Sequence, residues 1–207
     1  MLLEHGADYT KMGNDDKGPL TIAHLAYING LEDVLDEIIK RSKESKNISH
    51  LVPIFSELTT IIDDVFAISW ENCYQTDMQT LKKLMSVSGI TNAQDESGHT
   101  PLHHAVDSSN VVLTQIILKA NPDLNIQNKY GNTPLHAALD SNCKYDDDAY
   151  IEIAKKIIRN GADLTIKNNK KLTAFEQYQR LGENLREFQS SIKENRIKQN
   201  SKNGRIL

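Results

Sequence analysis

The chain has 207 residues, of which 39% are apolar and 25% charged, and its formal net charge is −4. This composition argues against wholesale disorder, and no run approaches the roughly 20 apolar residues that a membrane-spanning helix requires. A negative net charge also argues against a general nucleic-acid binder, which would have to neutralise phosphates, so we expect neither nucleic acid nor a membrane as the partner.

The N-terminal part of the chain contains pieces of a unit that returns later. Residues 1–8, "MLLEHGAD", follow the pattern of "KIIRNGAD" near the other end, so we interpret them as the end of a truncated repeat whose first helix is absent. Such a half-unit leaves an apolar face uncovered, which predicts either that the protein starts earlier or that Met1 is an unusual truncated beginning. We expect a monomer, in which the uncovered half-unit could self-associate. Residues 16–44 contain "TIAHLAYINGLEDVLDEII", a weak copy of a two-helix unit.

The next part of the chain is irregular. Residues 45–66 are interpreted as an inserted helical segment, because apolar residues from Ile54 to Phe66 recur at the i, i+3, i+4 and i+7 spacing of one buried helix face. Residues 67–90 are interpreted as a degenerate repeat, with "AISWENC" in its first helix and "DMQTLKKLM" as its second. A pocket in this part of the chain would favour a separate site, for which the candidate residues are His50, Glu57, Asp63, Asp64 and Cys73.

Two closely similar units follow, at 95–127 and 128–167. "GHTPLHHAV" returns as "GNTPLHAAL", and Thr133 stands 33 residues after Thr100. The next equivalent threonine is Thr173, 40 residues further on, and the 7 extra residues fall within "DSNCKYDDDAY", between the two expected helices. Residues 168–207 complete the array with "TAFEQY" and an increasingly polar helical tail, as expected for a C-terminal capping repeat.

These strings resemble the ankyrin repeat, a unit of about 33 residues with a β-turn and two antiparallel helices, in which T-P-L-H-x-A opens the first helix. "TPLHHA" and "TPLHAA" match that motif in full. The resemblance is strong over about 90–175 and weak before it. It implies one all-α domain over 1–207, an α-solenoid of helix-turn-helix units with hairpin fingers. The two cysteines suit free thiols in a reducing cytosol, so we expect a cytoplasmic protein. The many Lys, Asn and Ile residues suggest an AT-rich genome, such as that of an intracellular bacterium, and a secreted effector of such a bacterium would act in the host cytoplasm.

The T-P-L-H strings have the chemistry of a helix start. A threonine hydroxyl can accept an orphan backbone N–H at the N-cap, proline fits the first helical position, and leucine enters the core. The resemblance implies that the histidine hydrogen-bonds the turn and its neighbours, and this role is carried onto His24, His103 and His136. Gly98 and Gly131 supply a positive φ in the turn; Lys171 stands at that place in the last unit, which predicts a distorted turn.

The stretch "SGHTPLHHAV" raises the alternative of a metal site, since His99 and His103 are four residues apart. The cap at Thr100 puts His99 in the turn and His103 in the helix, so we expect no metal there, and we expect His104 to pack or to face solvent. Cys73 and Cys143 match no zinc spacing. Phosphate-binding and catalytic motifs are absent from the sequence, which predicts a protein that is not an enzyme and binds no cofactor.

We therefore predict a non-enzymatic module that binds a partner protein through the hairpin tips and the face of the first helices. The alternative is the regulatory or targeting part of a larger protein, enzymatic or a secreted effector, whose N-terminal part is missing. Residues not needed for the fold are the candidates for contact with the partner: Gln94, Glu96, Ser97, His99, Asp107, Ser108, Gln127, Lys129, Tyr130, Asn132, Asp140, Ser141, Lys167, Asn169 and Lys170.

Three features of the turns carry further expectations. Tyr130 is either an interface anchor or an aromatic lying on the neighbouring turn. Two adjacent turns contain four lysines, which predict an edge that attracts an acidic partner surface: Lys129, Lys167, Lys170 and Lys171. The asparagines Asn92 and Asn125 occupy a position that is hydroxylated in some eukaryotic members of the family, or else their amides tie the turns together.

Overall fold

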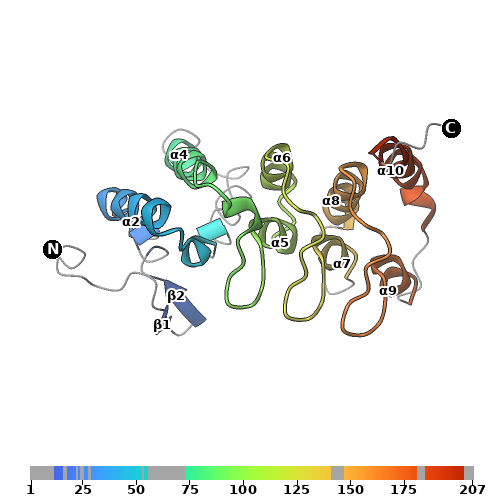
Figure 1. Ribbon diagram of the computed structural model, residues 1–207, viewed down its shortest axis with the longest axis horizontal. Helices are drawn as coiled ribbons and strands as arrows, with labels where there is room; N and C mark the ends of the chain where they lie inside the picture. The colour runs from blue at the N-terminus through green and yellow to red at the C-terminus, as the bar shows by residue number, and fades with distance from the viewer. Residues whose placement is uncertain are drawn as a thin grey trace.

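Pairs of helices stand side by side in an elongated row (Figure 1). The computed structural model describes residues 12–15, 18–21, 23, 26–27, 29–52, 54–55, 73–140, 147–180 and 185–202. Helices α5, α7 and α9 lie in one layer, and α6, α8 and α10 lie in the other (Figure 1). Three long loops project beyond the first layer. This arrangement confirms the predicted all-α solenoid. None of the described helices is long and apolar enough to cross a membrane.

The described N-terminal elements are a hairpin and a series of helices. Strand β1 pairs antiparallel with β2, so a hairpin precedes the first long helix, α2. Helix α4 corresponds to the predicted second helix of the degenerate repeat. It already includes Cys73, a residue of the string predicted for the first helix, so the second helix begins earlier than expected. The bounds are β1 Met12–Asp15, β2 Gly18–Thr21, α2 Glu32–Ser45, the 3₁₀ turn η2 Ser49–Leu51, α4 Cys73–Met85 and η3 Ile90–Asn92.

Several predictions for the N-terminal half lie outside the described residues. They concern the half-unit at 1–8, the helix over 56–66, the histidine His24 and the string around Trp70. Of the predicted inserted segment 45–66, residues 45–52, 54 and 55 are described. They do not form one inserted helix: Ser45 ends α2, the short turn η2 follows at Ser49–Leu51, and Ile54 and Phe55 are helical and fully buried.

The repeated units have clear helix boundaries. The Thr100 and Thr133 hydroxyls cap α5 and α7, and a proline follows each, as predicted. The second helix α6 is capped by Asn110, whose Oδ1 accepts the Leu113 N–H at 2.8 Å. The bounds are α5 Pro101–Asp107, α6 Val111–Lys119, α7 Pro134–Ala138, α8 Asp147–Arg159, α9 Ala174–Arg180, η4 Leu185–Phe188 and α10 Gln189–Lys202.

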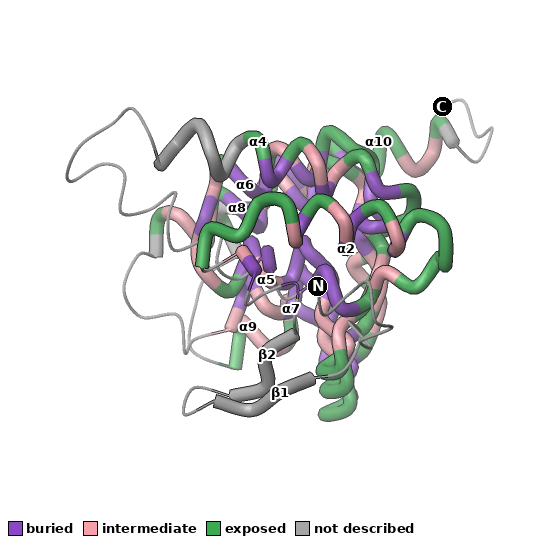
Figure 2. Tube along the Cα trace, turned by 90° about the vertical axis from the view of Figure 1, so that its left-hand side faces the viewer, coloured by how far each residue is buried: buried purple, intermediate pink, exposed green. Residues whose placement is uncertain are grey.

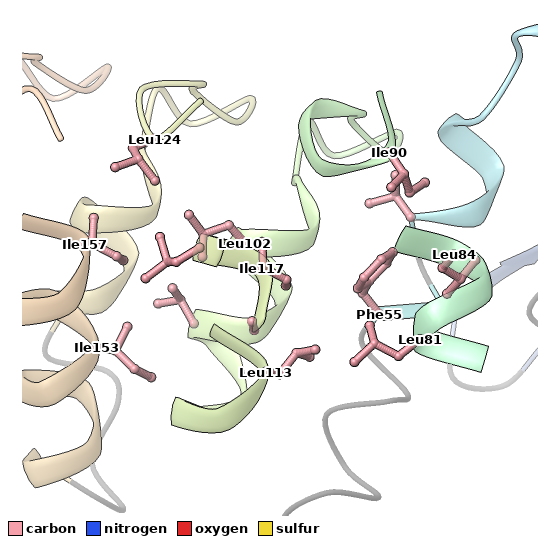
Figure 3. Close-up of a cluster of buried hydrophobic side chains, with 14 of the residues drawn as sticks. Phe55, Leu81, Leu84, Ile90, Leu102, Leu113, Ile117, Leu124, Ile153 and Ile157 are labelled. Atoms are coloured by element: carbon pink, nitrogen blue, oxygen red, sulfur yellow. The ribbon is translucent and has the colours of Figure 1, made fainter. Parts of the chain in front are cut away.

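The core runs along the row between the two layers (Figure 3). Leu102 of α5, Leu113 and Ile117 of α6, and Ile153 and Ile157 of α8 are all fully buried. Viewed along the row, buried residues lie inside and exposed residues outside (Figure 2). Since each such side chain contributes roughly 1.5–3 kcal/mol when fully buried, contact between neighbouring units stabilises what one short unit could not.

The last helix, α10, caps the row by packing against α8. The buried Asn195 amide donates to the carbonyl oxygens of Ile158 at 2.6 Å and Ala162 at 3.0 Å. The Gln199 amide donates to the Gly161 carbonyl at 3.0 Å. These bonds satisfy carbonyl groups at and just after the end of α8, which have no partner within that helix.

The last turn does not have the predicted distortion. Lys171 adopts a φ of 62°, close to the 77° and 74° of Gly98 and Gly131. Its N–H donates to the Asn168 carbonyl at 2.8 Å, as the Gly98 N–H does to that of Asp95 at 2.9 Å. The expectation was wrong because the surrounding hydrogen bonds hold the lysine in a left-handed conformation that glycine adopts more easily.

Candidate interaction surface

The two described T-P-L-H histidines connect each unit to the next. The Asn132 carbonyl can only accept, so the His103 Nε2, at 3.0 Å, must donate to it. The His103 Nδ1 is then free to accept the Thr100 backbone N–H at 3.1 Å. His136 repeats the arrangement, with Nε2 3.1 Å from the Leu172 carbonyl oxygen. The role implied by the resemblance is confirmed for both residues.

Burial keeps these imidazoles neutral. Burial lowers the pKa of His103 to about 4, and the hydrogen bond to the Asn132 carbonyl only partly opposes it. The pKa of His136 is also lowered by burial, against the opposing hydrogen bond to Leu172. A neutral ring with one donor and one acceptor nitrogen is the form that both sets of hydrogen bonds require.

The three long loops, here called the fingers, comprise residues 94–99, 127–132 and 167–172. Neighbouring fingers are joined through their backbones: the Lys129 N–H donates to the Ser97 carbonyl at 3.0 Å. The Asn169 N–H donates likewise to the Tyr130 carbonyl at 3.1 Å. The fingers therefore form one continuous, pre-organised edge.

Some predicted contact residues have a structural role within this edge. The Gln94 amide donates to the Gly98 carbonyl at 2.8 Å and to the Gln127 carbonyl at 3.1 Å. The Gln127 amide bridges in the same way to Lys167, at 3.0 Å. The Asn169 amide donates to the Lys129 carbonyl at 3.0 Å. The side-chain amide groups of these three residues are therefore held in place by the fingers themselves, before any partner binds.

The turn asparagines tie successive units together. The Asn92 Oδ1 accepts the Asp123 N–H at 2.8 Å, and the Asn125 Oδ1 accepts the Asp163 N–H at the same distance. The structural alternative offered for these two residues is thus the one that the geometry supports.

The structure places most of the predicted contact residues on the fingers and the ends of the first helices. His99, Ser108, Asn132 and Asp140 are half-buried, and Ser141 lies outside the described residues. The others are exposed: Gln94, Glu96, Ser97, Asp107, Gln127, Lys129, Tyr130, Lys167, Asn169 and Lys170.

The tips of the second and third fingers combine an aromatic ring with positive charge. The Tyr130 side chain is 68% exposed, and it makes no ring contact with another described residue. This exposure argues against a tyrosine that lies on the neighbouring turn. The four lysines of these fingers, here called the lysine edge, are exposed and form no ion pair with the described part of the chain: Lys129, Lys167, Lys170 and Lys171.

A polar cluster that the sequence reasoning missed lies where the first finger meets α5. The His104 Nε2 stands 2.9 Å from the Asp95 Oδ2, and the His99 ring packs edge-to-face against His104 with centroids 5.4 Å apart. Burial raises the pKa of Asp95, but the bonds from the His104 ring and the His99 N–H outweigh it, so the pKa lies below its usual value. The sequence does contain a sign of this cluster, because Asp95 stands at the position where the next two units have asparagine.

The separate site considered for the irregular segment has little support in the described residues. Of its five candidate residues, only His50 has a described side chain; it is buried, and its Nε2 is 2.9 Å from the Ser42 hydroxyl oxygen. The side chains of the other four lie outside the described residues.

Comparison with known proteins supports this description of the repeats. Residues 70–174 match the sequence model of a family described as ankyrin repeats, with three copies. The matched range begins before α4 and ends at the first residue of α9, so it includes the degenerate unit as well as the two clear ones. A search of curated proteins found no match.

Proposed function

Because the chain belongs to the ankyrin repeat family, we propose that it binds a partner protein through its finger tips and the face formed by its first helices. Ankyrin repeats are generally protein–protein interaction modules and are typically not enzymes. The observation that carries the proposal is the exposed Tyr130 on a finger whose backbone is hydrogen-bonded on both sides.

Pre-organisation gives this surface its capacity to bind. A partner that docks on the fingers does not have to order them, because the bonds from Lys129 to Ser97 and from Asn169 to Tyr130 already fix their spacing. A tyrosine offers a large amphipathic contact with few rotatable bonds, which is why this residue type is enriched among interface anchors. The lysine edge beside it would speed association with an acidic partner surface.

The proposal is tested by quantitative affinity capture with three forms of the full chain: wild type, Tyr130→Ala and Val112→Ala. Val112 is the matched control, because it is an exposed apolar residue, at 54%, on α6 in the layer away from the fingers. A partner should be depleted at least tenfold by Tyr130→Ala and retained by Val112→Ala. Equal capture by all three forms would place the binding surface elsewhere.

A further inference from the structure

The cluster at the base of the first finger brings together three metal-ligating side chains. One carboxylate oxygen of Asp95 and one ring nitrogen each of His99 and His104 all lie within 4.8 Å of one another. All three residues are half-buried, and the side chains of His104 and Asp95 are 14% and 11% exposed. We propose that Asp95, His99 and His104 form a binding site for a zinc ion, independently of any partner protein.

The Asp95 carboxylate offers more than the turn requires. Its Oδ1 accepts the N–H groups of Ser97 and His99, each at 2.8 Å. In the second finger the amide oxygen of Asn128 accepts the equivalent pair from Tyr130 and Asn132. An asparagine therefore suffices to build this turn. What aspartate adds at this position is a negative charge and a second oxygen, and that oxygen faces His104.

The histidines of the cluster divide into structural and available rings. Both nitrogens of His103 are occupied by the Thr100 N–H and the Asn132 carbonyl, so this ring cannot bind a metal ion. His103 is therefore not among the proposed ligands. His99 stacks on His103 with centroids 5.5 Å apart, and within the described part of the chain its ring nitrogens form no hydrogen bond. Its ring and that of His104 supply the two nitrogens.

The donor set fits zinc. Imidazole nitrogen and carboxylate oxygen are its common ligands, and three protein ligands leave a fourth position of the tetrahedron open. Calcium and magnesium prefer all-oxygen sites, which two imidazoles do not provide. The two N–H bonds to Oδ1 hold the carboxylate in place, as outer contacts do at metal sites. Asp107, at the end of α5, lies within electrostatic reach of both imidazoles, and burial raises the pKa of its carboxyl group.

A purely structural role explains only part of the cluster. In the third unit, Asn168 and Gln177 occupy the positions equivalent to Asp95 and His104. There the Asn168 amide donates to the Gln177 side-chain oxygen at 2.9 Å. A bond from finger to first helix therefore occurs without any metal. Packing against His103 and His104 accounts for the position of the His99 ring, but not for its two nitrogens, which form no hydrogen bond within the described part of the chain. His99 is therefore the residue that separates the two explanations.

The test replaces each proposed ligand with the residue that stands at the equivalent position of the next unit. His99→Asn, His104→Ala and Asp95→Asn each introduce the residue found 33 positions later, namely Asn132, Ala137 and Asn128. Zinc would be titrated into the metal-free full chain by calorimetry in competition with a chelator. The expected result is one zinc ion per wild-type chain and at least tenfold weaker binding in each variant. Asp140→Asn, one unit away from Asp107, is the control and should bind as wild type does.

Two further measurements keep the result interpretable. In the wild-type chain, zinc should shift the ring ¹⁵N resonances of His99 and His104 and leave those of His136 unchanged, which needs no variant to fold. A Cys73→Ser, Cys143→Ser form should retain the site, since thiols could otherwise bind the metal. No stoichiometric zinc, unchanged affinity in His99→Asn, or loss of binding with the cysteines would each overturn the proposal.

Discussion

The imidazole of His103 donates from Nε2 to the carbonyl oxygen of Asn132 at 3.0 Å, so the helix start of one unit is bonded to the turn of the next. Asn132 immediately precedes Thr133, which caps the following first helix. The same histidine position thus stabilises both the cap of its own helix and the stacking of neighbouring units. This coupling explains why short helices such as α7, with five residues, persist in the array.

Acidification should destabilise the protein through His136. Burial lowers the pKa of this histidine in the folded state, so below about pH 6.5 the unfolded chain binds a proton that the folded chain does not. The free energy of unfolding should therefore fall as the pH is lowered from about 6.5. Urea unfolding between pH 7 and pH 5, with chelator present, measures this slope.

The control for this prediction is His136→Gln, whose amide can donate to the Leu172 carbonyl but does not titrate. This variant should be less stable than wild type at pH 7, by about 1–3 kcal/mol, because the ring packing and one acceptor are lost. Its unfolding free energy should depend less on pH over the same range. A slope identical to that of wild type would show that His136 is not one of the groups responsible.

Gly131→Ala should destabilise the chain more than a positive φ alone accounts for. At φ 74° an L-residue costs about 1–2 kcal/mol. A Cβ there would also lie 2.6 Å from the backbone nitrogen of Asn169 in the next finger. Gly30→Ala is the matched control, since Gly30 has φ 64° and no atom within 4 Å of the added Cβ. We expect losses of about 1 kcal/mol at Gly30 and 2 kcal/mol or more at Gly131, measured by denaturant unfolding.

Lys171→Gly should stabilise the protein by about 0.5–1 kcal/mol. The lysine has a φ of 62°, and glycine removes the steric cost of that conformation while losing some of the gain to its greater freedom in the unfolded chain. Lys170→Gly removes a neighbouring exposed lysine without a positive φ, and it should have no effect or destabilise slightly. Equal changes in melting temperature for both variants would contradict the backbone argument.

The local features of the repeats could be predicted because they depend on residues close in sequence. The caps at Thr100 and Thr133, the glycine turns and the buried leucines follow from strings of six residues whose chemistry is self-contained. Lys171 is the exception among local features. Its strain is offset by bonds around the turn that no single residue reveals.

The contacts between units could not be predicted, because they depend on how the fingers stack. The Gln94 amide donates to the carbonyl of Gln127, which lies 33 residues later in the chain, and only the stacking of successive units brings these two residues together. The pairing of Asp95 with His104 requires the finger to fold back onto α5, and the four-residue spacing of His99 and His103 along the chain gives no sign of it.

Asn195→Ala should loosen the C-terminal cap. The buried amide donates to the carbonyl oxygens of Ile158 and Ala162. Without it the Ile158 oxygen keeps the Gly161 N–H, but the Ala162 oxygen loses this buried donor, at a cost of about 1–3 kcal/mol. Hydrogen exchange should quicken mainly in α10 and the last turn of α8. Lys193→Ala, an exposed position on α10, is the control and should leave exchange unchanged. Faster exchange spread evenly over all units would mean that α10 and α8 do not unfold as a local cap.

Charge reversal of Lys129 and Lys170 should slow association with the captured partner. The two side chains are exposed on the second and third finger tips, where a charge acts on the encounter and adds little to the final contact. Lys129→Glu with Lys170→Glu should lower the association rate constant several-fold at low salt, with a smaller effect on dissociation. The difference from wild type should shrink as ionic strength rises, because screening shortens the reach of the charges. Lys193→Glu is the control, because it reverses one exposed charge on α10, away from the fingers. It should leave the association rate constant near that of wild type. Unchanged association rates in the double variant would remove the lysine edge from the proposed surface.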